Sequence, residues 1–107
     1  MFMSEKEINI FWQLHDLYGY DPDISEVKSM ARGTEVLDTV NGVPIVRVYQ
    51  YKDEPYRVIF WCNWCKKFHG HGRGKIGKKD IGERVSHCTK ESSPFYKQSY
   101  YLQEVDE

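Results

Sequence analysis

The sequence predicts an α+β fold in which an N-terminal helix packs on an antiparallel β-meander that ends in a metal-binding knuckle. Three observations support this prediction. Apolar residues recur at helical spacing near the N-terminus, and the middle of the chain holds strand-like segments separated by turn residues. All three cysteines lie between residues 62 and 88. The knuckle is expected to be of zinc-ribbon or treble-clef type.

The N-terminal helix is expected at residues 4–18. Ser4 and Glu7 have the spacing of a capping box, and Gly19 is a suitable residue to end the helix. The face predicted to pack on the sheet consists of Ile8, Phe11, Trp12, His15 and Tyr18. Phe11 and Trp12 are therefore expected in the core. A short second helix is expected at residues 25–32.

The β-meander is expected at residues 34–62. Asn41-Gly42 is a strong two-residue hairpin signal, and it separates predicted strands at 34–40 and 43–51. A third strand at 56–61 follows a turn and delivers Cys62. The glycine-rich residues 69–82 are expected to form a loop. Strands at 84–89 and 99–105 complete the fold, and residues 1–107 are expected to form a single domain.

The cysteines and histidines of residues 62–88 have the spacing of a metal site. Cys62 and Cys65 form a C-x-x-C pair, which presents two thiolates to one ion, and Cys88 follows after 22 intervening residues. Cys88 is chosen over the adjacent His87, because three thiolates and one imidazole suit zinc, and His71 is chosen as the fourth ligand of a Zn²⁺ ion. His69 and His87 are alternatives for the fourth position. A different interpretation is three buried free thiols that behave as small apolar residues.

Positive charge is concentrated in the same part of the chain. Residues 62–84 hold seven Lys/Arg and two Asp/Glu, a net charge of +5 in a chain whose net charge is −1. The basic residues predicted to contact a nucleic acid or another partner are Lys66, Lys67, Arg73, Lys75, Lys78, Lys79 and Arg84. Trp64 and Phe68 would stack on bases or, in the alternative interpretation, pack around the metal. An ordinary solvated lysine-rich loop is also compatible with this composition.

Two enzymatic interpretations remain open. Strand, Trp61, C-x-x-C and Lys66 are similar to a thioredoxin active-site segment, but a glycine-rich stretch follows in place of a helix. A metal-dependent hydrolase or nuclease would use the additional histidines as a general base, although no acidic residue lies inside the ligand cluster. A thiol oxidoreductase and a metal-dependent hydrolase are therefore alternatives to a non-catalytic role.

Composition indicates the cellular setting. The chain has no apolar run long enough for a membrane span, and its N-terminus lacks a basic region followed by an apolar stretch. The odd number of cysteines favours a reduced environment. A cytoplasmic protein is therefore expected.

Several short motifs resemble those of a known family. They are Trp61-Cys62-Asn63-Trp64-Cys65, His69-Gly70-His71-Gly72, His87-Cys88, Ser93-Pro94-Phe95 and Tyr100-Tyr101-Leu102. This pattern resembles a family of small uncharacterised proteins of actinobacteria and bacteriophages, with W-C-x-x-C-x-x-x-H-x-H-G, then H-R-x-x-H-C, S-P-Y and G-Y-x-L. The chain departs from it at Glu83, where the pattern has histidine, at Asn63, where proline is common, and at Ser99, where glycine is common.

The resemblance covers roughly residues 56–103 and implies a zinc-binding fold in a phage or mobile-element setting, with no established activity. The leading expectation is a zinc-stabilised, non-catalytic binding module, encoded by a phage or prophage. It would act in the cytoplasm of the bacterial host and engage a host protein or nucleic acid, as a defence inhibitor or regulator.

Overall fold

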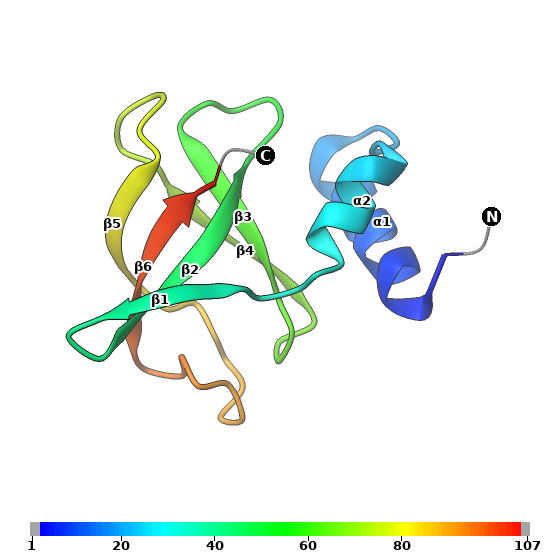
Figure 1. The fold of residues 1–107 in the computed structure, drawn as a ribbon. Helices are drawn as coiled ribbons and strands as arrows, with labels where there is room; N and C mark the ends of the chain where they lie inside the picture. Colours follow the sequence, from blue (N-terminus) through cyan, green and yellow to red (C-terminus); the bar gives the residue numbers. More distant parts are fainter. Residues whose placement is uncertain (1–2, 106–107) are drawn as a thin grey trace.

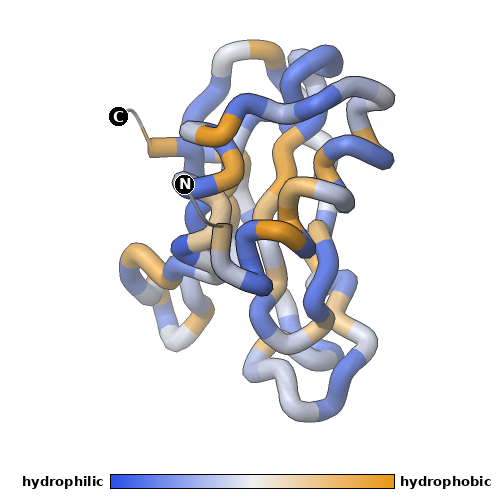
Figure 2. The backbone as a smooth tube through the Cα atoms, turned by 90° about the vertical axis from the view of Figure 1, so that its right-hand side faces the viewer, coloured by the Kyte–Doolittle hydropathy of each residue, from blue (hydrophilic) through white to orange (hydrophobic). Residues whose placement is uncertain are grey.

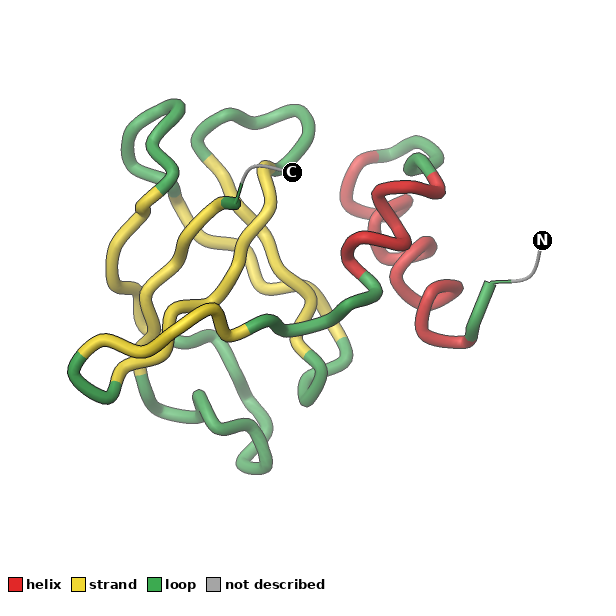
Figure 3. The backbone as a smooth tube through the Cα atoms, in the orientation of Figure 1, coloured by secondary structure: helices red, strands yellow, loops and turns green. Residues whose placement is uncertain are grey.

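The computed structural model describes residues 3–105, which fold into two helices beside one curled sheet (Figures 1 and 3). The helices are α1 (Glu5–Tyr18) and α2 (Ile24–Met30). The strands are β1 (Val36–Val40), β2 (Val43–Gln50), β3 (Arg57–Cys62), β4 (Lys67–Gly72), β5 (Asp80–Val85) and β6 (Ser99–Glu104). The predicted α+β class is confirmed.

Helix α1 begins and ends at the residues that the sequence indicates. The Glu7 N–H donates to Ser4 Oγ at 3.1 Å, and the Ser4 N–H donates to Glu7 Oε1 at 2.8 Å. Gly19 ends the helix with φ +80°, a conformation that glycine adopts without steric cost. The predicted buried face is wrong in part. Ile10 and Leu14 are fully buried, whereas Trp12 is 56% exposed, because the helix packs through the neighbouring stripe of residues.

The sheet is mixed rather than purely antiparallel. Its strand order is β4-β3-β2-β6-β5, and β1 pairs separately with β2. The β2–β6 pair is parallel, with Ile45 opposite Tyr101, and the other pairs are antiparallel. Strands β1 and β3 occupy one edge of β2 in succession, so the C-terminal strand pairs with the other edge. The sequence contains the local hairpins but no local signal for this long-range parallel pairing.

Half of the expected loop at residues 69–82 is strand: residues 69–72 belong to β4 and residues 80–82 to β5. Strand β4 pairs with β3 along its whole length, from Cys62 opposite Lys67 to Arg57 opposite Gly72, and residues 73–79 alone connect β4 to β5. Gly70 fits this strand for a steric reason. A Cβ atom at Gly70 would lie 2.9 Å from the guanidinium of Arg57. A glycine within a strand often marks such a close approach. Composition alone does not distinguish a glycine-containing strand of this kind from a glycine-rich loop.

Strand β3 separates two hydrophobic cores. Val58, Phe60 and Cys62 face the interior of the curled sheet, and Ile59 and Trp61 face the helices. The sheet core also contains Val46, Val48, Ile81, Cys88, Phe95, Tyr100 and Leu102. The helix core also contains Ile10, Leu14, Val27, Met30 and Tyr51. Figure 2 shows hydrophobic segments through the middle of the molecule and hydrophilic segments in many outer turns. Cys62 therefore lies in the sheet core, at the end of a strand that is buried on both faces.

Neither helix in residues 3–105 is long and apolar enough to cross a membrane.

Candidate metal centre

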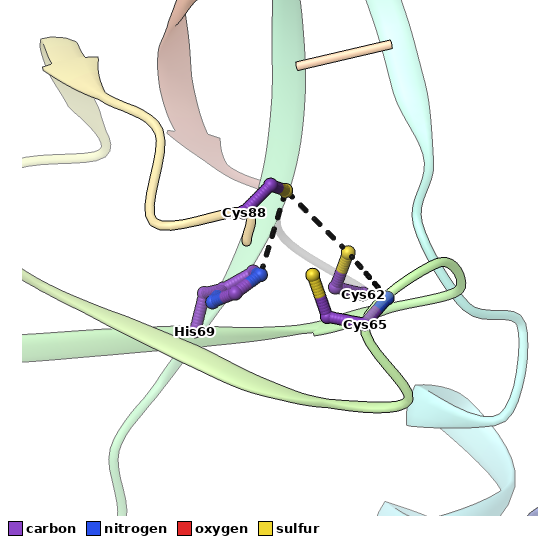
Figure 4. Close-up of side chains that lie close together, drawn as sticks. All are labelled: Cys62, Cys65, His69 and Cys88. Carbon is purple, nitrogen blue, oxygen red and sulfur yellow. Dashed lines mark hydrogen bonds between the residues drawn. The ribbon is translucent and has the colours of Figure 1, made fainter. Parts of the chain in front are cut away.

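Four ligand atoms converge at one end of the curled sheet. They belong to Cys62, Cys65, His69 and Cys88, and all lie within 4.8 Å of one another (Figure 4). The sulfurs of Cys62 and Cys88 are 3.6 Å apart, and Cys88 Sγ lies 3.5 Å from His69 Nε2. In a tetrahedral zinc site, bonds of ~2.3 Å to sulfur and ~2.0 Å to nitrogen place sulfurs ~3.8 Å apart, and sulfur ~3.6 Å from nitrogen. These two separations match such a site.

The knuckle is the turn of the β3–β4 hairpin. Cys62 ends β3 and pairs with Lys67, the first residue of β4. The chain reverses at Lys66, whose φ is +57°, and the Lys66 N–H donates to the Cys62 carbonyl at 2.9 Å. The Cys65 N–H points at Cys62 Sγ, at 3.5 Å. This turn places both thiols on the same side of the hairpin, as the C-x-x-C spacing predicts.

His69 reaches the centre because of its place on β4. Residues two apart in a strand face the same side, so His69 and His71 both face the sheet interior, and both are buried. His69 lies opposite Phe60, close to the hairpin turn, whereas His71 lies opposite Val58. At a rise of ~3.3 Å per residue, His71 is ~7 Å farther along the strand. Distance along β4 therefore selects His69.

His71 and His87 form a separate pair beside the centre. His71 Nε2 lies 2.7 Å from the hydroxyl oxygen of the buried Tyr100. The His71 and His87 rings are stacked, with centroids 4.1 Å apart. The structure thus brings together three predicted ligands, Cys62, Cys65 and Cys88, with His69 in the position that the sequence analysis assigned to His71. His87 lies outside this group of four.

The protein environment disfavours charge on two of the four side chains. Burial raises the pKa of the Cys62 thiol to about 12. Burial, together with the nearby His87 and Lys67, lowers the pKa of His69 to about 4, so its imidazole is neutral at neutral pH. Burial also opposes ionisation of Cys65, but hydrogen bonds from the N–H groups of Thr89 and Lys90, together with those from the Cys62 and Cys88 side chains, lower that pKa. The four side chains thus offer one neutral imidazole and three thiols. A bound cation would favour loss of the thiol protons and would be held by the resulting thiolates and the imidazole.

The three cysteines are free, and the site residues fit a metal ion of borderline softness. No disulfide joins Cys62, Cys65 or Cys88. The donor set holds three sulfurs and one nitrogen, and soft sulfur ligands favour zinc over magnesium or calcium. The cluster could therefore bind a metal, with all four ligands supplied by the protein.

Neighbouring residues hold the knuckle in place. Thr34 Oγ1 donates to the Trp61 carbonyl at 2.8 Å and accepts from the Asn63 N–H at 3.1 Å. Gln13 Nε2 on α1 donates to the Lys66 carbonyl at 2.9 Å. These contacts connect the knuckle to both the helix and the α2–β1 connection. No sequence signal predicts these contacts, because neither Thr34 nor Gln13 belongs to a recognisable motif.

The two aromatic residues of the knuckle region are partly buried and pack against the hydrophobic cores. Trp64 meets Phe95 edge to face, with ring centroids 5.6 Å apart, and Phe68 meets Trp61 in the same way at 5.1 Å. Trp64 contacts the sheet core and Phe68 the helix core. The structure therefore shows a packing role for both rings.

The predicted basic residues do not form one patch around the centre. Lys66 and Lys67 are exposed at the knuckle, whereas Lys75, Lys78 and Lys79 lie in the 73–79 connection at the opposite end of β4. A six-residue strand spans ~17 Å between its first and last residues. The knuckle lysines and the lysines of the 73–79 connection are close in the sequence, but the extended strand β4 separates them in space.

The two arginines of this set serve the fold. Arg73 is only 2% exposed, and its Nη2 lies 2.7 Å from a carboxylate oxygen of Glu104. Arg84 donates to the carbonyl of Gly72 at 3.1 Å and to that of Glu83 at 2.8 Å. Arg73 is thus buried where surface contact with a partner was expected.

The chain matches no protein-family model, no curated protein and no solved structure.

Proposed function

We propose that this protein is a small zinc-stabilised binding module in which the metal has a structural, non-catalytic role. The observation that carries the proposal is the group of four ligand atoms of Cys62, Cys65, His69 and Cys88, all within 4.8 Å of one another. Three sulfurs and one imidazole nitrogen are typical of structural zinc sites. Zinc binding would deprotonate the three thiols and complete the coordination.

The position of the centre supports a structural role. Cys62, Cys65 and His69 belong to the β3–β4 hairpin, whereas Cys88 lies in the segment between β5 and β6. A metal ion joining them would fix this long segment to the hairpin and close one end of the sheet core. Small domains commonly gain stability in this way, because their hydrophobic cores are limited.

Geometry supports this role over the two enzymatic alternatives. Four protein ligands leave no coordination position for a catalytic water. An oxidoreductase needs an activated first thiol at a helix N-terminus, but Cys62 ends a strand and its pKa is raised to about 12 by burial. The non-catalytic role is therefore the better-supported proposal.

The proposed setting is the bacterial cytoplasm, where a phage- or prophage-encoded protein would engage a host protein or nucleic acid as a defence inhibitor or regulator. The motif resemblance supports this setting. Exposed lysines at both ends of β4 support contact with an acidic surface or a phosphate backbone. A steep fall of affinity with salt would support nucleic acid, and binding that persists in salt would support a protein partner.

The test of the zinc centre is the metal content of protein purified without added metal. We expect one zinc per chain, lost in Cys62→Ser, Cys88→Ser and His69→Ala. His71→Ala is the matched control, because His71 lies on the same face of β4 outside the cluster, and it should retain the metal. Metal-free protein with a reversible Cys62–Cys65 disulfide would contradict the proposal. Retention in His69→Ala with loss in His71→Ala would contradict the ligand assignment.

A further inference from the structure

Two of the four proposed metal ligands, Cys62 and Cys88, lie at a distance that permits a disulfide after a small movement. Their sulfurs are 3.6 Å apart, compared with ~2.05 Å in a disulfide, and Figure 4 marks the contact between them. Cys62 belongs to the β3–β4 hairpin, and Cys88 lies in the segment between β5 and β6. A bond between the two sulfurs would therefore join the same parts of the chain that the proposed zinc ion joins.

Contacts within the protein position both thiols. Cys62 ends β3 and is fully buried in the sheet core. The Cys88 N–H donates to Ser86 Oγ at 3.0 Å. The hydroxyl of the buried Tyr100 lies beside the Ser86 side chain and is 2.7 Å from His71 Nε2. Strand pairing, burial and hydrogen bonds thus hold Cys62 and Cys88 near each other, in addition to any coordination of an ion.

The third thiol has a different place in the centre. Cys65 lies in the knuckle turn and is half-buried, whereas Cys62 and Cys88 are buried. A Cys62–Cys65 disulfide would stay within the knuckle and leave Cys88 unattached. A Cys62–Cys88 disulfide would instead close a loop with 25 intervening residues, and a disulfide that closes a longer loop stabilises a fold more. Because a free thiol next to a disulfide exchanges with it, the three thiols should settle on the Cys62–Cys88 pair.

We propose that the centre is a redox switch in which a hydroperoxide releases the zinc ion and a Cys62–Cys88 disulfide takes over its cross-link. This inference rests on the proposed zinc centre and specifies how that centre is regulated. One thiolate attacks hydrogen peroxide, which breaks the O–O bond and forms a sulfenic acid and hydroxide. The second thiolate displaces another hydroxide from that sulfur and forms the S–S bond.

The peroxide is the only oxidant that this reaction needs. Zn²⁺ has no redox chemistry of its own, so the two thiolates supply both electrons that reduce the peroxide. The two hydroxides take two protons from solvent and become water. With two of its four ligands joined in a disulfide, the ion leaves as Zn²⁺, and the Cys65 thiolate takes up a proton. Cys65 and His69 thus lose their ion, while Cys62 and Cys88 remain connected and keep this end of the sheet core closed.

The experiment treats the metal-loaded full chain with hydrogen peroxide. A chromogenic chelator measures the released zinc, alkylation counts the free thiols, and peptide mass spectrometry locates the disulfide. Zinc content is measured before peroxide is added, so a failure of the proposed zinc centre is recognised separately. Peroxide treatment of the metal-free protein then tests the Cys62–Cys88 pairing by itself.

We expect peroxide to release one zinc per chain together with the loss of two free thiols. The disulfide should join Cys62 to Cys88 and leave Cys65 as the free thiol. Reduction with dithiothreitol should restore all three thiols and full zinc binding. Metal-free Cys65→Ser protein should form the same Cys62–Cys88 disulfide, because neither of its two thiols is changed.

Urea unfolding tests whether the disulfide replaces the cross-link. The oxidised wild-type protein should unfold at a higher urea concentration than the reduced, metal-free protein, because its disulfide closes a long loop. Cys88→Ser is the matched control. Its thiols can pair only within the knuckle, so oxidation should leave its unfolding midpoint unchanged.

Four results would overturn the proposal. In the first, the protein keeps its zinc and its thiols in peroxide. In the second, the product is a Cys62–Cys65 disulfide with a free Cys88 thiol, which would mean that oxidation breaks the connection between the two segments. In the third, dithiothreitol does not restore zinc binding, as expected if the thiols were oxidised beyond a disulfide. In the fourth, oxidation raises the unfolding midpoint of Cys88→Ser as much as that of the wild-type protein.

Discussion

The buried Arg73 forms an ion pair with the half-buried Glu104, with 2.7 Å between Arg73 Nη2 and a carboxylate oxygen of Glu104, at the end of the sheet opposite the candidate metal centre. The same Nη2 donates to Gln50 Oε1 at 2.6 Å, and Nη1 donates to the Lys78 carbonyl. One guanidinium therefore joins the ends of β2 and β6 to the 73–79 connection. Different groups therefore lie at the two ends of the curled sheet. One end has the cluster of thiols and an imidazole, and the other has the guanidinium of Arg73.

Replacing Arg73 should destabilise the protein strongly. Arg73→Met leaves the Glu104 carboxylate and the Gln50 amide oxygen without their partner. Breaking a fully buried ion pair costs ~3–5 kcal/mol, which is the upper limit here because Glu104 is partly exposed. The measurement is urea-induced unfolding of the metal-loaded protein. Lys75→Met, at an exposed position of the same connection, is the control and should change stability by less than ~0.5 kcal/mol. Equal effects of the two substitutions would show that the ion pair does not stabilise the fold.

Thr34→Val should weaken both the fold and the metal centre. Valine has nearly the same shape but cannot replace the hydrogen bonds to the Trp61 carbonyl and the Asn63 N–H. The expected loss of stability is ~1–3 kcal/mol. Because these bonds orient the knuckle, zinc affinity measured by chelator competition should fall at least ~10-fold. Thr39→Val, on the exposed strand β1, is the control, and a matching loss there would count against this role for Thr34.

The sequence predicts most of the local structure, because local signals determine it. The capping box of Ser4 and Glu7, the Asn41-Gly42 turn and the C-x-x-C knuckle each occupy a few consecutive residues, and each forms where expected. The parallel pairing of β2 with β6 is different. It depends on which edge of β2 remains free after β1 and β3 have paired, a property of the assembled sheet.

The candidate site shows the same division. Cys62, Cys65 and Cys88 are identified by residue type and spacing, whereas the choice between His69 and His71 depends on distance from the hairpin turn. That distance is known only once residues 67–72 are recognised as a strand, and the glycines at 70 and 72 suggested a loop instead. No local sequence signal predicts that Arg73 is buried, because its partner Glu104 is 31 positions away in the sequence.

Stability should fall at alkaline pH in a way that depends on Tyr18. Burial raises the pKa of the Tyr18 hydroxyl well above its usual value, and its hydrogen bond to Glu26, at 2.8 Å, adds to this effect. Above pH ~10 the unfolded chain releases the phenol proton while the folded protein retains it, so the free energy of unfolding decreases as pH rises.

Tyr18→Phe removes this proton linkage. Between pH 10 and 11, its free energy of unfolding should fall less steeply with pH than that of the wild-type protein. The difference between the two slopes should be less than ~1.4 kcal/mol per pH unit, because the Tyr18 side chain is partly solvated. Urea unfolding at a series of pH values measures the two slopes. Tyr56→Phe is the control, because Tyr56 is 60% exposed, and this variant should retain the wild-type slope. Parallel slopes for Tyr18→Phe and the wild-type protein would refute the linkage.

Alanine substitutions on α1 should distinguish the observed packing from the face that its sequence pattern suggests. Leu14 is fully buried in the helix core, and Leu14→Ala should cost ~2–5 kcal/mol through lost burial and the resulting cavity. Trp12 is 56% exposed, so Trp12→Ala should cost less than ~1 kcal/mol although it removes the larger side chain. Urea unfolding of both variants measures the difference. A larger loss for Trp12→Ala would mean that α1 packs through the Trp12 face in solution, because only a buried tryptophan could contribute so much.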